Sequence, residues 1–214
     1  MEFPRLNAIV DADVASRAGW PLLELAGAIL EGGARFLQLR AKQMSGAELL
    51  ETAAQIVALA RPHDAIVIVN DRADIAALSG ASGVHLGQDD LAPRAARRIV
   101  GDRATIGRST HNEAQIDAAL REPVDYIAVG PVFDTMTKAT GYQAVGLDLV
   151  RYAARAQRPV VAIGGITLER APAAIAAGAQ SVAVVSDLLT GGDPRARVRA
   201  FVDRLARADA AQAD

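Results

Sequence analysis

The 214-residue sequence contains no cysteine, few aromatic residues and only two lysines. The absence of cysteine excludes a disulfide framework, a thiolate zinc site and catalysis by a cysteine nucleophile. Aromatic residues make up 4% of the chain and the formal net charge is -2. The chain therefore lacks both the basic surplus and the stacking platforms that are typical of a nucleic-acid-binding protein.

Long apolar runs are also missing. No run approaches the roughly 18 residues of a membrane-spanning helix, and the residues from Met1 to Arg5 contain no apolar stretch of the signal-peptide type. We therefore expect a cytoplasmic protein with no membrane segment. Hydrophobic residues make up 51% of the chain, which is enough for a sizeable core and too many for a disordered chain.

The chain alternates short apolar runs, mostly β-branched and bounded by turn residues, with Ala-rich segments of helical periodicity. The runs predict strands at residues 6–10, 36–39, 66–69, 83–86, 105–107, 126–129, 160–163 and 182–185. The intervening segments predict helices at residues 21–31, 46–60, 74–78, 92–100, 113–120, 147–156, 168–177 and 194–207.

Eight strand-then-helix units without a break in composition predict an α/β fold with a parallel sheet covered by helices. Eight units in about 200 residues favour a single (β/α)8 barrel, a TIM barrel, over residues 1–207. An open, doubly wound sheet is the alternative, because periodicity does not establish closure. Residues 208–214 are small and polar, and we expect them to form a frayed tail.

In a parallel barrel, catalytic groups come from the carboxyl ends of the strands and the loops that follow. The second strand leads into Gln38, Arg40 and Lys42, whose period of two aims side chains to one face of an extended strand. Two cations and an amide at a barrel mouth suit a polyanion such as a diphosphate. The alternative is a solvated strand end with ordinary charges.

Two pairs of residues with side-chain oxygen ligands follow the next two strands. Asn70 and Asp71 follow the third strand, and Asp89 and Asp90 follow the fourth. Such oxygen ligands, together with substrate phosphates, commonly hold Mg²⁺. Each pair also precedes a helix, so helix N-caps are the alternative. The neighbouring cations favour the metal.

A second anion site is predicted near strands six to eight. The loop after strand six runs from Gly130 to Gly141, longer than the usual two to about six residues, and contains Thr135, Thr137 and Lys138. Gly164-Gly165 follows strand seven and allows a backbone N–H to approach an anion, while Ser186 follows strand eight. Two anion sites at one mouth predict two phosphorylated substrates, or one long one.

These motifs together resemble thiamine-phosphate synthase, also called thiamine-phosphate pyrophosphorylase. The resemblance extends from about Leu6 to Leu189, with the motifs in family order. They are Gln38-Leu-Arg-Ala-Lys42, Val69-Asn-Asp-Arg72, Gly83-Val-His-Leu-Gly-Gln-Asp-Asp90, Gly107-Arg-Ser-Thr-His111, Gly130-Pro-Val-Phe133, Thr135-Met-Thr-Lys138, Ala162-Ile-Gly-Gly-Ile166 and Val184-Val-Ser186.

The resemblance implies a transferase that joins hydroxymethylpyrimidine diphosphate to a thiazole phosphate in the presence of Mg²⁺. It implies that diphosphate departs first and that the thiazole nitrogen captures the resulting cation. The expected pyrimidine-diphosphate ligands are Gln38, Arg40, Lys42, Asn70, Ser109 and Lys138, of which Lys138, Arg40 and Ser109 are the expected catalytic residues. The expected Mg²⁺ ligands are Asp71 and Asp90, and the expected thiazole-phosphate ligands are Thr135, Thr137, Gly165, Val185 and Ser186.

The sequence departs from the family pattern at a few positions. Ala41 stands where many members carry Glu, and Arg108 replaces a common small apolar residue. Arg108 either alters the pyrimidine pocket or points outward. Rival functions are a thiazole tautomerase using His111, a phosphate-sensing barrel, and a Schiff-base aldolase using Lys138. The retained diphosphate and metal motifs argue against them. A homo-oligomer is left open.

Overall fold

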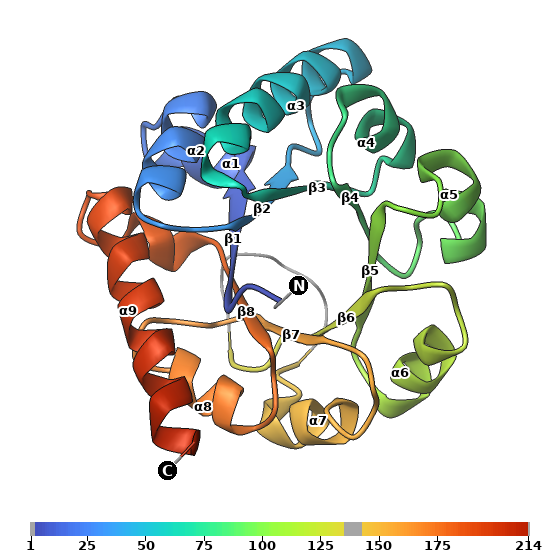
Figure 1. The fold of residues 1–214 in the computed structure, drawn as a ribbon, viewed down its shortest axis with the longest axis vertical. Helices are drawn as coiled ribbons and strands as arrows, with labels where there is room; N and C mark the ends of the chain where they lie inside the picture. Colours follow the sequence, from blue (N-terminus) through green and yellow to red (C-terminus); the bar gives the residue numbers. More distant parts are fainter. Residues whose placement is uncertain (1–2, 135–142, 214) are drawn as a thin grey trace.

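The computed structural model describes residues 3–134 and 143–213. Eight parallel strands form a closed barrel in sequence order (Figure 1). Because β1 pairs with β2 on one side and with β8 on the other, the sheet has no open edge. The (β/α)8 barrel is thereby confirmed and the open sheet excluded. The strands are β1 (Leu6–Asp11), β2 (Phe36–Arg40), β3 (Ile66–Asn70), β4 (Gly83–Leu86), β5 (Thr105–Thr110), β6 (Tyr126–Val129), β7 (Val160–Ile163) and β8 (Ser181–Val184).

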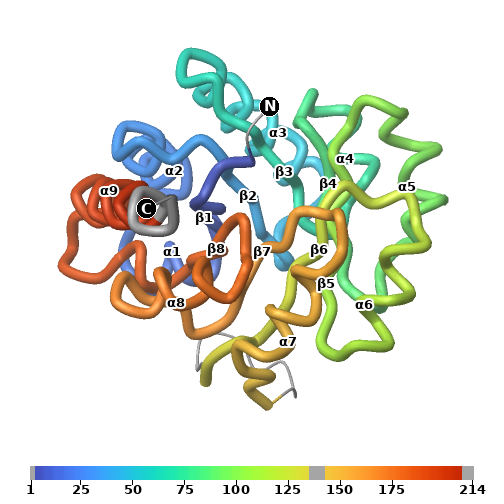
Figure 2. Tube along the Cα trace, turned by 60° about the horizontal axis from the view of Figure 1, so that its bottom comes forward, coloured from blue at the N-terminus to red at the C-terminus, as the bar shows by residue number. Residues whose placement is uncertain are grey.

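Helices surround the barrel on its outer side, and Figure 2 shows the same ring obliquely, with α2 and α9 side by side. Several helix starts have side-chain caps of the expected chemistry. Ser45 and Glu48 form a reciprocal capping box on α3, and Asn112 accepts a hydrogen bond from the N–H of Gln115 on α6. The helices are α1 (Ala12–Arg17), α2 (Leu22–Glu31), α3 (Gly46–Ala60), α4 (Ala73–Ser79), α5 (Pro93–Val100), α6 (Glu113–Leu120), α7 (Gly146–Ala153), α8 (Ala171–Ala176) and α9 (Pro194–Ala213), with 3₁₀ turns η1 (Arg61–His63) and η2 (Ser186–Leu189).

Some element boundaries differ from the predicted ones. β5 continues through its polar residues to Thr110, because these pair with Ile127, Ala128 and Val129 of β6. Helix α9 extends to Ala213, beyond the predicted end at residue 207, in keeping with the high helix propensity of the alanines there. Fraying of this tail stays a prediction. Helix α1 was not predicted, since it follows β1 directly and is only six residues long.

Two apolar layers make up the core. The larger one lies between the strands and the helices, where outward-facing residues such as Leu37, Val69 and Ile127 pack against helix residues. The smaller one fills the barrel interior with the alternate residues of the strands, including Ile9, Ile68 and Val161. This alternation explains why the strands read as continuous apolar runs rather than as period-two patterns.

Aromatic rings close the barrel interior at the amino-terminal end of the strands. Phe3, Phe36 and Tyr126 contact one another with ring centroids 5.2–5.8 Å apart. Because the amino-terminal end of the barrel is filled with large apolar rings, the polar groups of the barrel interior are concentrated at the opposite, carboxyl end.

No helix in the described ranges is both long and apolar enough to cross a lipid bilayer.

Gly107 of β5 accommodates the ring of Tyr126 within the barrel. A Cβ at this position would overlap the Tyr126 ring and the Nδ1 atom of His85. We expect Gly107→Ala to lower the free energy of unfolding by about 1–3 kcal/mol through overpacking, as measured by urea denaturation. Gly27→Ala in α2 is the control, because its Cβ meets no atom within 4 Å. This variant should gain roughly 0.5–1 kcal/mol. Equal effects of the two substitutions would contradict the expectation.

Candidate active site

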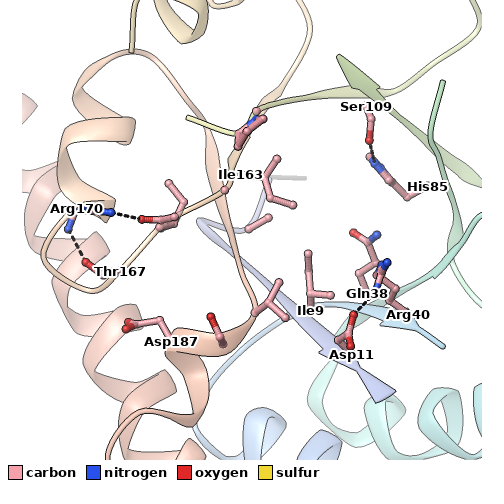
Figure 3. A pocket seen from close by; sticks show the side chains of 18 of the residues that line it. Ile9, Asp11, Gln38, Arg40, His85, Ser109, Ile163, Thr167, Arg170 and Asp187 are labelled. Atoms are coloured by element: carbon pink, nitrogen blue, oxygen red, sulfur yellow. Dashed lines mark hydrogen bonds and ion pairs between the residues drawn. The ribbon is translucent and has the colours of Figure 1, made fainter. Parts of the chain in front are cut away.

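A cavity of about 380 Å³ occupies the carboxyl end of the barrel, and its lining comes from all eight strands or the loops that follow them (Figure 3). One half is lined by side chains of β1 to β5, and the other by the segments after β6, β7 and β8. Residues predicted for both anion sites therefore border one continuous space. The predicted residues that line it are Gln38, Arg40, Asn70, Ser109, Gly165, Val185 and Ser186.

Several predicted residues lie inside strands rather than in the loops after them. Gln38 and Arg40 are in β2, and Ser109 is in β5. Their side chains reach the cavity because alternate residues of a barrel strand face inward. Lys42 does not continue the period-two row, since β2 ends at Arg40 and the chain turns. The expectation that all three side chains of this motif share one strand face was wrong for Lys42.

Amide groups link the first three strands across the cavity floor. Gln38 Nε2 donates to Asn70 Oδ1 at 3.0 Å, and Asn7 Nδ2 donates to Gln38 Oε1 at 3.5 Å. Both ends of the Gln38 amide therefore have partners on neighbouring strands. Gln38 is 4% exposed, so these bonds hold its side chain in a single orientation.

Arg40 is held by a carboxylate that the sequence did not single out. Asp11, at the end of β1 and in register with Arg40, forms an ion pair with the guanidinium. Asp11 also accepts a hydrogen bond from the N–H of Val14 at 3.0 Å and so caps α1. Figure 3 shows Asp11 and Arg40 side by side at the wall of the cavity. The usable signal was its position directly after the first strand, the same signal that identified Asp71.

Asp71 and Asp90, the predicted metal ligands, come together beside Lys42. Lys42 Nζ lies 2.9 Å from Asp71 Oδ2, and Asp90 Oδ2 accepts a hydrogen bond from the Gly87 N–H at 2.7 Å. Burial raises the pKa of Asp90, and its contact with the Asp71 carboxyl raises it further. The Gly87 N–H and the Lys42 ammonium act in the opposite direction.

The donor set of this acidic pair suits a hard divalent cation. Two carboxyl groups in contact repel each other unless they share a proton or a cation. No group of three or more Asp, Glu, His or Cys residues in the described ranges has metal-binding geometry. One or two carboxylates completed by substrate phosphates and water is the usual arrangement for Mg²⁺. Asp71 and Asp90 therefore fit Mg²⁺ better than they fit a metal that needs a complete set of protein ligands.

His85 connects Ser109 to the buried base of the cavity. Its Nδ1 is 2.9 Å from the Tyr126 hydroxyl and its Nε2 is 2.9 Å from Ser109 Oγ. Burial strongly raises the pKa of Tyr126, so the phenol keeps its proton and needs an acceptor. With the Tyr126 hydroxyl as the donor to Nδ1, the proton of the neutral imidazole is assigned to Nε2, facing Ser109. The Ser109 hydroxyl can then donate its own hydrogen to a ligand oxygen.

The other half of the cavity is built from backbone around Gly164 and Gly165. Both glycines have positive φ, and a Cβ on Gly164 would overlap Pro131, while one on Gly165 would overlap Phe133. Glycine is therefore required at both positions by backbone conformation and by space. The N–H of Phe133 donates to the Gly164 carbonyl at 3.0 Å, which joins the segments after β6 and β7.

Charged residues that the sequence analysis missed line this same half. Arg170 Nη1 donates to the Gly165 carbonyl at 3.1 Å and its guanidinium stacks on the Phe133 ring. Asp187 accepts from the Leu168 N–H at 3.0 Å and from Arg197 at 2.7 Å, which ties the segments after β7 and β8 to α9. Neither residue belongs to a recognisable motif. The one signal in the sequence that could have identified them is their position in the segments after strands seven and eight.

Three predicted residues, Thr135, Thr137 and Lys138, lie outside the described residues. Their assignment to the site stays a prediction from the sequence. His111, the residue that the tautomerase alternative would use, has its Nδ1 atom 2.5 Å from the Gly130 carbonyl. A contact of this kind holds the imidazole against the backbone after β6.

A closed parallel barrel with a polar cavity at the carboxyl ends of its strands has the architecture of a (β/α)8-barrel enzyme. The family model described as thiamine monophosphate synthase matches residues 6–188. The chain therefore belongs to the thiamine monophosphate synthase family.

Individual relatives agree with this membership. A thiamine-phosphate synthase of Koribacter versatilis is 44% identical over 208 residues, covering 96% of this chain and 97% of that protein. One of Mycolicibacterium gilvum is 50% identical over 193 residues, covering 85% of this chain and 81% of that protein. The solved structure of a thiamine phosphate pyrophosphorylase from Pyrococcus furiosus has a TM-score of 0.87 at 29% identity, covering 95% of this chain and 96% of that one.

The assigned donors and acceptors around His85 predict which of its ring nitrogens carries the proton. We expect the imidazole nitrogens of His85 in ¹⁵N NMR spectra to show a protonated Nε2 and an unprotonated Nδ1. In Tyr126→Phe the donor to Nδ1 is lost, so the preference for this tautomer should weaken and the protein should lose about 0.5–1.5 kcal/mol of stability. A protonated Nδ1 in the unchanged protein would contradict the assignment.

Proposed function

We propose that the chain is a thiamine-phosphate synthase. It would condense 4-amino-2-methyl-5-hydroxymethylpyrimidine diphosphate with 4-methyl-5-(2-phosphoethyl)thiazole to give thiamine monophosphate and diphosphate. With the carboxylated tautomer of the thiazole as substrate, the carboxylate would leave as CO₂ in addition. The observation that carries the proposal is the single cavity with two halves suited to anions, of which one is lined by Asn70, the residue next to Asp71 in the chain. Family membership supports the same activity.

The pyrimidine diphosphate is assigned to the half formed by β1 to β5. Arg40 would bind the diphosphate with a guanidinium that Asp11 already orients, so little side-chain freedom is lost on binding. Lys42 would share its charge between Asp71 and the diphosphate. Gln38 and Asn70, hydrogen-bonded to each other, form the floor beneath the substrate.

The chemical step needs charge stabilisation rather than a nucleophile of the protein. The bond between the pyrimidine methylene carbon and the diphosphate oxygen breaks, and its electron pair leaves with the diphosphate. The thiazole nitrogen then donates its lone pair to the methylene carbon. Arg40, the Ser109 hydroxyl and Lys138 would stabilise the negative charge that develops on the departing oxygen. Mg²⁺ bound at Asp71 and Asp90 would supply further neutralisation of the diphosphate.

The thiazole phosphate is assigned to the half formed after β6, β7 and β8. The loops after strands seven and eight are the common phosphate site of barrel enzymes. Gly165 and the segment that starts at Val185 and Ser186 line this part of the cavity. Thr135 and Thr137 would add hydroxyl donors from the sequence motif.

Both substrates carry phosphates, which do not cross a bilayer unaided. We therefore place the proposed reaction in the cytoplasm.

The proposed reaction can be tested directly with both phosphorylated substrates. We expect thiamine monophosphate and diphosphate in equal amounts when Mg²⁺ is present, and a large loss of rate when EDTA removes it. Reactions that lack either substrate are the controls. No thiamine monophosphate in the presence of Mg²⁺ would overturn the proposal. Conversion of the carboxylated thiazole to its tautomer without pyrimidine diphosphate would instead favour a tautomerase.

Lys138 is expected to act on the departing diphosphate. Lys138→Ala should lower turnover by about 100- to 1,000-fold, the usual effect of removing one donor to a developing charge. The free energy of unfolding should change by less than about 0.5 kcal/mol. Lys138→Arg is the matched control. It keeps the positive charge but replaces the compact ammonium with a planar guanidinium, and it should retain more activity than Lys138→Ala. Near-normal turnover of Lys138→Ala would refute this role.

A further inference from the structure

Arg108 stands between two inward-facing residues of β5 but does not enter the cavity. Its neighbour Ser109 lines the cavity, and successive side chains of a strand point to opposite faces. Arg108 is in register with Leu86, the last residue of β4. The half-buried guanidinium is thereby placed beside the segment that leads from β4 to Asp90.

The guanidinium of Arg108 binds two consecutive carbonyl groups of this segment. Nη1 donates to the Gly87 carbonyl at 2.6 Å and Nη2 donates to the Gln88 carbonyl at 3.3 Å. Gln88 Nε2 in turn donates to the carbonyl of Ser109 at 2.5 Å. Three hydrogen bonds therefore join residues 87–88 to residues 108–109, in addition to the strand pairing of β4 and β5.

The same segment positions the carboxylate of Asp90. The Gly87 N–H donates to Asp90 Oδ2 at 2.7 Å, and the Asp90 N–H returns to the Gly87 carbonyl at 3.4 Å. Gly87 thus contacts Arg108 through its carbonyl and Asp90 through its N–H. Any movement of the Gly87 backbone changes where the Asp90 carboxylate points.

We propose that Arg108 is a positioning residue for the metal-binding carboxylate of Asp90, acting through the backbone of Gly87 and Gln88. The inference rests on the proposed function, since it assumes a divalent cation at Asp71 and Asp90. Outer contacts that orient a metal ligand typically change metal affinity by about 10- to 100-fold when they are removed.

The charge of Arg108 acts against its positioning effect. The guanidinium lies close enough to Asp90 and Asp89 for their charges to favour its protonated form, although burial lowers its pKa. A positive charge near Asp90 repels a metal cation bound there. If charge alone mattered, removal of Arg108 would strengthen metal binding. The positioning effect predicts the opposite sign, so the two are separable by experiment.

Three variants separate positioning, charge and general stability. Arg108→Ala removes the forked donor and the charge, whereas Arg108→Lys keeps the charge and at most part of the hydrogen bonding. Arg97→Ala is the matched control. Arg97 of α5 also binds backbone carbonyls, those of Gly101, Ala104 and Pro123, but these are not cavity residues.

The experiment measures binding of Mn²⁺ by electron paramagnetic resonance, with and without inorganic diphosphate, alongside thermal unfolding of each variant. We expect Arg108→Ala to weaken Mn²⁺ binding about 10- to 100-fold, and Arg108→Lys to fall between it and the unchanged protein. Arg97→Ala should lose stability and keep its Mn²⁺ affinity.

Equal or tighter Mn²⁺ binding by Arg108→Ala would overturn the inference, as would an equal loss in Arg97→Ala. If the unchanged protein forms thiamine monophosphate but Arg108→Ala binds Mn²⁺ normally, the positioning role fails while the proposed function stands. If the unchanged protein neither binds Mn²⁺ nor forms product, both are overturned.

Discussion

The pairing of β1 with β8 is the contact on which the rest of the molecule depends. Leu6, Asn7 and Ala8 lie opposite Val182, Ala183 and Val184, and this register turns a parallel sheet into a closed barrel. Closure brings the carboxyl ends of all eight strands to one rim, so residues from β2 and from the segment after β8, distant in sequence, border the same cavity. It also gives every strand an inner and an outer face, which separates the cavity residues from those that pack against the helices.

Within the closed barrel, the apolar filling and the polar rim depend on each other. Phe36 and Tyr126 fill the interior below the cavity, and Gly107 leaves the space that the Tyr126 ring occupies. The Tyr126 hydroxyl is then at the right height to bond His85, which in turn contacts Ser109. A packing requirement at the base of the barrel thereby orients a polar group at its mouth. Tyr126, His85 and Ser109 therefore form one hydrogen-bonded chain from the barrel interior to the cavity.

Arginine occurs both on the surface and at the cavity, which Arg40 and Arg170 line, whereas lysine is rare in this chain. Many arginines form ion pairs on the outside, such as Arg151 with Asp148 and Arg94 with Glu122, where a guanidinium adds little stability. Lys42, one of only two lysines in the chain, instead contacts Asp71 beside the cavity. A compact ammonium and a planar guanidinium bind phosphate differently, so retention of lysine in an arginine-rich sequence is informative about the site.

Much of the fold follows from local patterns along the chain. Short β-branched runs alternating with amphipathic segments were sufficient to predict all eight strands and the barrel, and the polar residues at strand ends identified Gln38, Arg40, Asn70 and Ser109 as cavity residues. Local patterns did not predict the continuation of β5 to Thr110, which depends on pairing with β6, nor the bond between Asp11 and Arg40. Nor could they choose between the two orientations of Arg108. Periodicity and turn chemistry act over a few neighbouring residues, so the strands and helices that they determine can be predicted from the sequence. Partners that join separate strands exist only once closure has set the register, and that is a property of the folded barrel.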